Sequence, residues 1–213
     1  MRYELIPDFL TADECNALIV IAKSRLQPSY TWDVTTGTSI INEYRKSEQM
    51  FFTMRESPLI ASIEERIANL TGYPVENGEG LQVVFYKPGG YYYGHWDYFA
   101  EEYEGNRAVI DRGGQRIVTV LMYLNNMYTN YISEKVTPEQ EKEMGEKATI
   151  GDTWFPRMDL SVKPDHVGKA IFWHNMKQDG VTVDPTTYHA GRPVPQGGQK
   201  IIMTKWIRAG TFT

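Results

Sequence analysis

The sequence predicts a mainly β protein with N-terminal helices, in which the helices pack on one sheet of a β-sandwich or jelly roll. Two observations predict this class. Two amphipathic segments with helix-capping residues lie near the N-terminus, and several short β-rich runs with glycine- and proline-containing turns follow them. The length of 213 residues fits one domain. Within it, we expect residues 1–75 to form a helical support region and residues 80–208 to form the jelly-roll core.

Both helices are predicted from their caps and their apolar spacing. A helix is expected over residues 11–26, because Thr11 and Glu14 form a capping box ahead of an apolar stripe. Cys15 belongs to this stripe and is expected to face the core. A second helix is expected over residues 57–72, with proline at its first position and glycine at its end.

The strands are predicted from four apolar runs, which are Leu81–Tyr86, Arg116–Leu124, Lys169–Trp173 and Lys200–Arg208. The second run is apolar on both faces, as expected of a central strand. Residues 125–149 interrupt this pattern because they are polar and charged. They predict an inserted loop that carries a short exposed helix beginning at Thr137-Pro138.

Composition excludes several functional classes. One cysteine cannot form an internal disulfide or a thiolate zinc site, and a formal net charge of -5 disfavours a nucleic-acid surface. The opening residues MRYELIPDFL lack the apolar core of a signal peptide, and no apolar run reaches the ~18 residues of a membrane span. We therefore expect a cytoplasmic protein without nucleic-acid or membrane partners, of unspecified oligomeric state.

Aromatic side chains are crowded into one short stretch of the chain. They are Tyr91, Tyr92, Tyr93, Trp96, Tyr98, Phe99 and Tyr103. Aromatics at this density line either a core or a binding groove. Because aromatics dominate protein cores, we expect about half of these rings to be buried.

Histidine and aspartate spacing suggests a metal site. His95 and Asp97 are two residues apart, so in an extended segment they present a nitrogen and an oxygen on the same face. A third ligand is needed, and His189 is favoured because it precedes a turn-rich segment and an apolar strand. His166 lies in a polar turn and is expected on the surface. His174 is expected in the core or near the surface, with a hydrogen bond, and is kept as a reserve ligand. Two histidines and one carboxylate on a β-scaffold are typical of non-haem Fe(II) oxygenases.

A lysine on an apolar strand face supports the same interpretation. Lys200, Ile202, Thr204 and Trp206 share one face of their predicted strand. A lysine among such neighbours is costly to bury unless an anion pairs with it. Three metal ligands leave open positions for a bidentate oxo-acid and dioxygen. The lysine could bind the far carboxylate of such an acid.

Several longer segments carry a family resemblance. They are LQVVFYKPGGYYYGHWDYF at 81–99, GGQRIVTVLMYLN at 113–125, GDTWFP at 151–156, GKAIFWHN at 168–175 and YHAGRPVPQGGQKIIMTKWIR at 188–208, together with FLTADECNALI and EYRKSEQMFF nearer the N-terminus. In this combination the chain resembles the prolyl 4-hydroxylase family of 2-oxoglutarate- and Fe(II)-dependent dioxygenases over nearly its whole length. The resemblance implies a double-stranded β-helix of the cupin-like, jelly-roll type.

The resemblance also implies residue roles. The iron ligands would be His95, Asp97 and His189. The residues that hold 2-oxoglutarate would be Lys200, which pairs with the distal carboxylate, and the hydroxyl-bearing Tyr86 and Thr119.

Further roles concern the substrate. Tyr92 matches a catalytic tyrosine that helps to position the reacting substrate, and Trp206 matches a tryptophan that lines the cosubstrate pocket. Arg45 and Ser47 match a motif near the peptide groove, and Trp96 would suit the same groove. Core packing for the tryptophans and a surface salt bridge for Arg45 are the alternatives.

The implied reaction is hydroxylation of peptidyl proline at C4 with release of succinate and CO2. It would use Fe(II), 2-oxoglutarate and O2, with ascorbate (vitamin C) as reductant. Proline-rich peptides adopt the polyproline II form and bind aromatic grooves. Two alternatives stay open, a dioxygenase acting on a free amino acid or other small molecule and a non-catalytic, metal-containing jelly-roll binding module. A buried Lys200 argues against the binding module.

Overall fold

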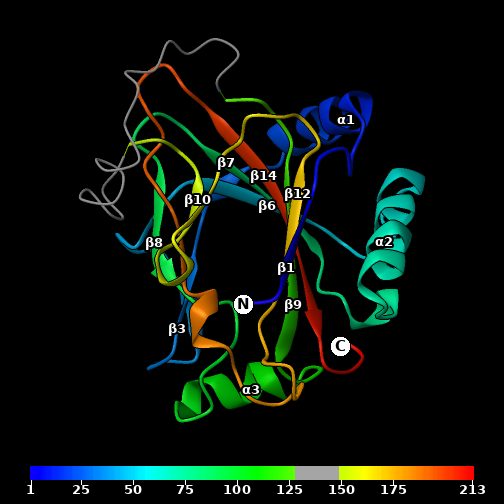
Figure 1. Cartoon of the computed structure of the whole chain (residues 1–213), viewed down its shortest axis with the longest axis vertical. Coiled ribbons are helices and arrows are strands. Elements are labelled where there is room, and N and C mark those ends of the chain that lie inside the picture. Colours follow the sequence, from blue (N-terminus) through cyan, green and yellow to red (C-terminus); the bar gives the residue numbers. More distant parts are fainter. Residues whose placement is uncertain (128–148) are drawn as a thin grey trace.

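The protein is a three-layer structure in which two β-sheets face each other and two helices cover one of them. The computed structural model describes residues 1–127 and 149–213. In Figure 1 the helices α1 and α2 lie on the outer side of the larger sheet, while strands of the smaller sheet lie on its other side. This arrangement confirms the predicted mainly β jelly roll with helices packed on one sheet.

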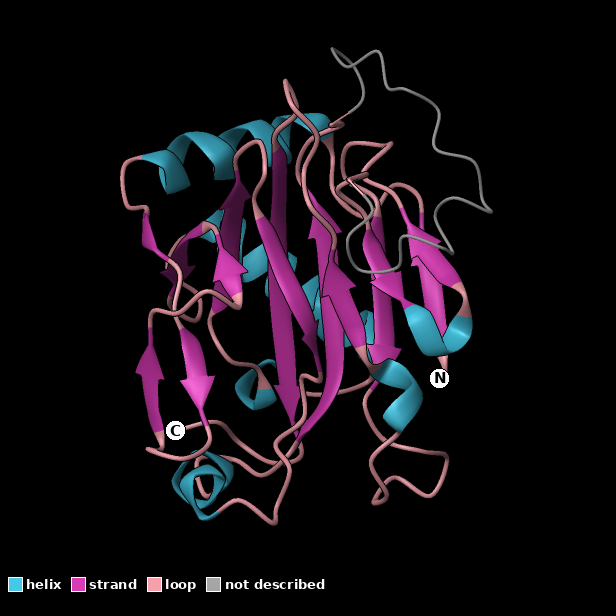
Figure 2. Ribbon diagram, turned by 90° about the vertical axis from the view of Figure 1, so that its left-hand side faces the viewer, coloured by secondary structure: helices cyan, strands magenta, loops and turns pink. Residues whose placement is uncertain are grey.

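Among the described residues, the larger sheet has seven strands in the order β1-β12-β9-β14-β7-β6-β2. In that order their bounds are Tyr3–Ile6, Ala170–His174, Arg116–Tyr123, Lys200–Arg208, Leu81–Tyr86, Glu48–Phe52 and Gln27–Pro28. The smaller sheet has five strands in the order β11-β10-β13-β8-β5. Their bounds are Leu160–Val162, Thr153–Phe155, His189–Gly191, Tyr91–His95 and Arg45–Lys46. A separate hairpin pairs β3 with β4, which are Thr31–Asp33 and Thr38–Ile40. Neighbouring strands pair antiparallel throughout, and Figure 2 shows them edge to edge.

Both predicted helices form. Helix α1 spans Ala12–Lys23, and both hydrogen bonds of the Thr11 capping box are present. Helix α2 spans Pro58–Thr71 and ends at Gly72, whose φ of 75° is the left-handed conformation that glycine adopts without strain. The short helices α3, η1, η2, η4 and η5 span Arg107–Ile110, Val75–Asn77, Glu104–Asn106, Pro156–Met158 and Pro185–Thr187.

The predicted strands are found within one residue of their expected ends. Strands β7 and β14 have the predicted bounds, whereas β9 ends one residue early and β12 begins and ends one residue late. The expected helical support region, residues 1–75, also supplies strands to both sheets. These are β1 and β2 at the two edges of the larger sheet, β6 beside β2, and β5 at one edge of the smaller sheet. The inserted loop predicted over residues 125–149, with its short helix, falls almost wholly in 128–148, outside the described residues.

Two apolar clusters hold the layers together, because side chains alternate between the faces of each strand. The outer cluster lies between the helices and the larger sheet and includes Cys15 of α1, Ile63 of α2 and Val83 of β7. The inner cluster lies between the sheets and includes Val84 of β7 and Phe155 of β10. Cys15 is fully buried, as predicted.

A buried ion pair also joins helix α2 to the larger sheet. Lys205 of β14 donates to Glu64 of α2 at 2.6 Å, and neither side chain has appreciable exposure. Lys205 lies on the outer face of β14, so this strand carries one buried lysine toward the helices and another, Lys200, toward the inner space between the sheets.

The expected burial of the aromatic stretch is wrong. Of its seven rings only that of Phe99 is buried, and the others are half-buried or exposed. The stretch runs along β8, which pairs with β13 and β5 in the smaller sheet, and along the loop after it. No helix in the described parts of the chain is long and apolar enough to cross a bilayer.

Candidate metal centre

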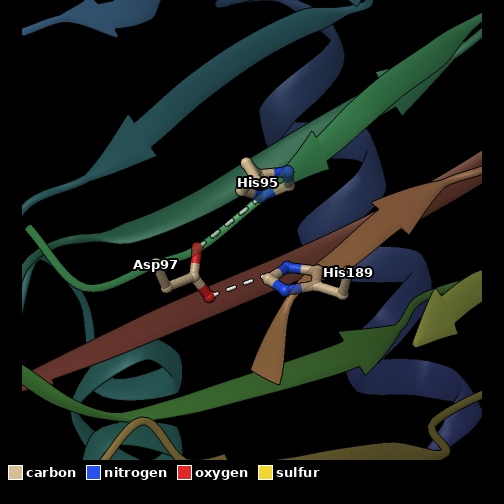
Figure 3. A group of neighbouring side chains, drawn as sticks. All are labelled: His95, Asp97 and His189. Carbon is tan, nitrogen blue, oxygen red and sulfur yellow. Dashed lines mark ion pairs between the residues drawn. The ribbon is translucent and has the colours of Figure 1, made fainter. Parts of the chain in front are cut away.

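Three side chains converge between the two sheets, as Figure 3 shows. His95 is the last residue of β8, Asp97 follows two residues later, and His189 is the first residue of β13. His95 and His189 are direct partners in the antiparallel pairing of β8 with β13. One ligand atom from each of the three residues lies within 4.8 Å of the others, and the described residues contain one such group. The structure therefore brings together the three predicted metal ligands.

Hydrogen bonds orient both imidazole rings in the same way. Nδ1 of His95 bonds the carbonyl of Tyr93, and Nδ1 of His189 bonds the carbonyl of Thr187, each at 2.9 Å. A carbonyl oxygen only accepts, so each Nδ1 carries the hydrogen and each Nε2 presents a lone pair. Such outer hydrogen bonds are usual for histidines that bind metals.

The distances within the group fit a shared ion better than direct contacts. Nε2 of His95 lies 3.7 Å from one oxygen of Asp97, and Nε2 of His189 lies 3.8 Å from the other. These separations are too long for hydrogen bonds. Two nitrogen donors and one carboxylate are the set that non-haem Fe(II) uses. The residues present thus fit this metal.

The protonation states also suit metal binding. Burial, followed by the neighbouring His189, lowers the pKa of His95 to about 3, so this imidazole is neutral at physiological pH. Burial alone would raise the pKa of Asp97. Its neighbours His189, His95 and Arg116 outweigh burial and hold that pKa below its usual value. Asp97 is therefore an ionised carboxylate.

Behind Asp97 lies a chain of buried hydrogen bonds. The hydroxyl of Thr119 donates to Asp97 Oδ2 at 2.8 Å and accepts from Nδ2 of Asn175 at 3.1 Å. The resemblance implied that this hydroxyl holds the cosubstrate carboxylate. A threonine has one hydroxyl proton, and here it is directed to the metal ligand instead.

Lys200 lies on the inner face, opposite Tyr86 in the pairing of β14 with β7. Its ammonium is 5.0 Å from the centre of the Tyr86 ring and donates to the carbonyl of Asp152 at 3.1 Å. Lys200 is 1% exposed. Burial lowers its pKa to about 8, although the carboxylate of Asp152 opposes this shift. The predicted buried lysine is present, with only a carbonyl as its direct hydrogen-bond partner among the described residues.

An ion pair sealed from solvent lies beside Lys200. Nε of Arg192 donates to Asp152 Oδ1 at 2.7 Å, and a second guanidinium nitrogen bonds the other carboxylate oxygen. Both side chains have no exposure. The guanidinium also stacks over Trp154, 4.9 Å from its ring centre. This pair joins β13 to the start of β10 and fixes the carbonyl that Lys200 contacts.

A cavity of about 860 Å³ contains the metal centre and Lys200. Such a volume is in the usual range for small-molecule sites. Its wall includes every predicted site residue except Ser47, namely His95, Asp97, His189, Lys200, Tyr86, Thr119, Tyr92, Trp206, Arg45 and Trp96. Tyr91 and Tyr93 are not among the lining residues, so the tyrosine cluster contributes only Tyr92 to the cavity.

Tyr92 contacts both the metal centre and Arg45. Its ring stacks on His95 with centroids 3.7 Å apart, and the guanidinium of Arg45 lies over the same ring, 4.7 Å from its centre. Burial raises the pKa of Tyr92 to about 12, so its hydroxyl stays protonated. Arg45 is buried and donates to Ser47 at 3.1 Å. Arg45 thus contacts Tyr92, and its burial argues against the surface salt bridge, while its place near a peptide groove stays a prediction.

The remaining predicted residues lie as follows. Trp206 packs under the guanidinium of Arg116, which is 3.9 Å from its ring centre. Trp96 is 37% exposed and donates to the carbonyl of Pro185. His166 is exposed and bonds Asp8, as expected of a surface histidine. The reserve ligand, His174, does not join the metal-binding group.

Sequence reasoning missed several residues at this site. They are the buried polar residues Asn175, Asp152 and Arg192. Asn175 contacts Thr119 and Asp152 contacts Lys200, whereas Arg192 contacts Asp152. The segments that contain them were recognised, but a single sequence shows neither the partner nor the burial of a polar side chain. The partial signal was Thr119, whose hydroxyl on an apolar strand requires a polar partner.

Comparison with known proteins agrees with this geometry. Residues 81–208 match the 2OG-Fe(II) oxygenase superfamily, which is more than half of the chain. Prolyl 4-hydroxylase 2 of Arabidopsis thaliana is 36% identical over 209 residues, covering 96% of this chain and 66% of its own. Prolyl 4-hydroxylase 1 of the same plant is 36% identical over 222 residues, covering 97% and 69%. The chain thus spans about two thirds of the length of these relatives.

A solved structure is similar over nearly the whole chain. It is the viral collagen prolyl hydroxylase from Paramecium Bursaria Chlorella virus-1 in its 2OG complex, with a TM-score of 0.67 and 27% identity. The match covers 98% of this chain and 97% of that one. The fold and the site together define a 2-oxoglutarate-dependent dioxygenase. Within that class, the chain belongs to the prolyl 4-hydroxylase family.

Proposed function

We propose that the protein hydroxylates peptidyl proline at C4. One C–H bond of proline becomes C–OH while 2-oxoglutarate and O2 are converted to succinate and CO2. The observation that supports this most strongly is the presence of a two-histidine, one-carboxylate group and a buried lysine in the same cavity. The prolyl 4-hydroxylase relatives support proline as the substrate.

In this proposal His95, Asp97 and His189 hold Fe(II), which supplies activation of O2 when bound. The chain fixes the two imidazole rings through their Nδ1 atoms and keeps the carboxylate ionised. The ligand atoms are therefore oriented before the metal arrives.

Lys200 is the proposed anchor for the distal carboxylate of 2-oxoglutarate. It is a buried cation whose direct partner is a backbone carbonyl, so a carboxylate would provide the missing negative charge. Tyr86 faces it across the strand pair, and burial raises the pKa of Tyr86, so its hydroxyl remains a hydrogen-bond donor. A simple binding module has no need of such a lysine, which disfavours that alternative.

The peptide would approach over an aromatic part of the cavity wall. Half-buried or exposed rings that line it are Tyr30, Trp32, Trp96, Tyr98 and Tyr103. Aromatic surfaces of this kind bind the extended polyproline II form. Tyr92, which contacts both Arg45 and His95, is the proposed residue that orients the reacting proline.

A succinate-release assay with Fe(II), 2-oxoglutarate and a proline-rich peptide tests the proposal. Succinate should form in proportion to peptide turnover, and mass spectrometry should locate one added oxygen on proline. Turnover that ignores the peptide but responds to free proline would favour the small-molecule alternative. Intact metal binding without succinate under any condition would favour a binding module. Ascorbate as reductant and the cytoplasmic location stay predictions.

A further inference from the structure

The hydrogen bonds behind Asp97 form a chain of four buried side chains. The indole nitrogen of Trp173 donates to Oδ1 of Asn175 at 2.9 Å, and Nδ2 of Asn175 donates to Thr119 at 3.1 Å. The hydroxyl of Thr119 then donates to Oδ2 of Asp97 at 2.8 Å. Trp173, Asn175 and Thr119 have no exposure, and Asp97 is 5% exposed. This hydrogen-bonded series runs from the end of β12 to β9 and reaches Asp97, a predicted metal ligand.

The direction of this chain follows from the chemistry of its first member. An indole N–H can only donate, so the atom of Asn175 that faces Trp173 must be the carbonyl oxygen. The amide nitrogen of Asn175 therefore faces Thr119 and donates to it. Because Thr119 accepts from Asn175, its single hydroxyl proton is left for Asp97. The orientation of the asparagine amide is thus fixed by its partners.

The backbone holds Asn175 where this contact requires it. The amide of Asn175 donates to the carbonyl of Ile117 at 2.8 Å, and its carbonyl accepts from the amide of Asp184 at 2.8 Å. Ile117 and Thr119 belong to the same strand, β9. Asn175 is therefore fixed to the strand whose hydroxyl it orients.

We propose that Asn175 is a positioning residue for the metal centre. By occupying the acceptor side of the Thr119 hydroxyl, it directs that proton to Asp97 and holds the carboxylate toward His95 and His189 before a metal binds. The inference rests on the proposed function only for the assignment of these three residues as metal ligands. Loss of an outer hydrogen-bond partner of a ligand typically weakens metal binding about ten- to hundredfold.

Titration of the metal-free protein with Mn(II), with free Mn(II) followed by electron paramagnetic resonance, tests this role without catalysis. Asn175→Leu and Thr119→Val should each raise the Kd for Mn(II) about ten- to hundredfold. Thr119→Ser keeps the hydroxyl and should retain wild-type affinity. Both substitutions interrupt the same series of hydrogen bonds. The double variant should therefore bind Mn(II) about as weakly as whichever single variant binds it more weakly.

A matched control separates positioning from general destabilisation. Asn77 is also buried, and its Nδ2 donates to the carbonyl of Arg208 at 3.2 Å, away from the metal centre. Asn77→Leu should leave the Kd for Mn(II) unchanged. If Asn175→Leu does not fold, Asn175→Asp replaces it. This variant has nearly the same shape, but its carboxylate cannot donate and competes for the Thr119 proton, so Mn(II) binding should again weaken.

Three outcomes would overturn the inference. If the folded Asn175 variants bind Mn(II) with wild-type affinity, Asn175 has no positioning role and only Thr119 supports Asp97. If Asn77→Leu weakens Mn(II) binding equally, the effect of the Asn175 variants reflects a general loss of stability and not positioning of Asp97. If the wild-type protein does not bind Mn(II), the assignment of His95, Asp97 and His189 as a metal centre is wrong. That last result is the failure of the proposed function, and it is distinguishable because it does not require any variant.

Discussion

His95 and His189 are direct partners across two antiparallel strands, and their ring centroids lie 4.3 Å apart. Because side chains alternate between the faces of a strand, a shift of one residue in β13 would turn His189 away from His95. The pairing of β13 with β10 on its other side, where Gly191 faces Thr153, opposes such a shift. Strand register therefore determines whether the metal centre forms.

Removing one histidine ligand should abolish both metal binding and turnover. For His189→Ala we expect Mn(II) affinity to fall by more than ~100-fold, beyond the usual effect of an outer partner. Succinate release should become undetectable. His166→Ala is the control, because this exposed histidine contacts only Asp8 among the described side chains and should leave both measurements unchanged. Wild-type affinity in His189→Ala would contradict the ligand assignment.

The two buried lysines of β14 allow a paired experiment on cosubstrate binding. Lys200→Met should raise the KM for 2-oxoglutarate about ten- to hundredfold, since a charge-assisted hydrogen bond contributes roughly 1.5–3 kcal/mol. Mn(II) affinity should not change. Lys205→Met leaves Glu64 buried without its partner and should lower the free energy of unfolding by about 3–5 kcal/mol, with the KM unaltered. The reverse pattern would disprove the anchor role of Lys200.

The pH dependence of 2-oxoglutarate binding should report on Lys200. Burial lowers the pKa of this lysine to about 8 before cosubstrate binds. Below that pH the ammonium attracts a carboxylate, and above it the neutral amine does not. The KM for 2-oxoglutarate should thus be level below pH 8 and rise toward tenfold per pH unit above it. Lys200→Arg keeps its charge and should remove this rise. A level wild-type KM through about two units above pH 8 would count against the shifted pKa.

Removing one member of the buried pair of Asp152 and Arg192 should destabilise the protein more than removing both. Arg192→Met leaves the Asp152 carboxylate without its guanidinium partner in a site closed to solvent. We expect the free energy of unfolding in urea to fall by about 3–5 kcal/mol. The double variant Arg192→Met with Asp152→Leu removes both charges and should recover most of this loss. Equal destabilisation in the single and double variants would show that the charges matter less than shape.

Replacing Trp96 should weaken binding of the peptide but not binding of 2-oxoglutarate. It lines the cavity and is 37% exposed, so Trp96→Ala removes a ring that the peptide can cover. Aromatic contacts contribute roughly 0.5–1.5 kcal/mol, which predicts a two- to tenfold rise in the KM for peptide. Tyr93 is similarly exposed at 42% but does not line the cavity, so Tyr93→Ala should have no effect. Equal effects of both variants would place the peptide elsewhere on the surface.

The sequence predicts best those elements whose signals are local. The capping box of α1, the proline and glycine at the ends of α2, and the apolar runs of β7 and β14 each depend on neighbouring residues alone. Strands β1 to β6 were missed because most are short edge strands or hairpin strands, without a continuous apolar run. They exist because a partner strand is present, as β6 pairs with β7.

The same distinction explains the outcome at the site. The spacing of His95 and Asp97, the resemblance around His189 and the face of Lys200 predicted the residues that surround the cavity. Partners across the fold were not predictable in this way. Nothing within a single segment indicates that Asn175 would meet Thr119, which is 56 positions away in the chain. Aromatic burial was overestimated because rings at a cavity wall have the same composition as rings in a core.

The position of Cys15 bears on its exposure to oxidants from the metal centre. A centre that handles O2 can release oxidants, and thiolates are the side chains that they attack first. The chain has one cysteine, and it lies on α1, across the full thickness of the larger sheet from the metal centre. Burial raises its pKa to about 11, which keeps it a thiol. The seven-stranded sheet thus lies between the only sulfhydryl group and the site at which oxidants would form, and burial keeps that group in its less reactive thiol form.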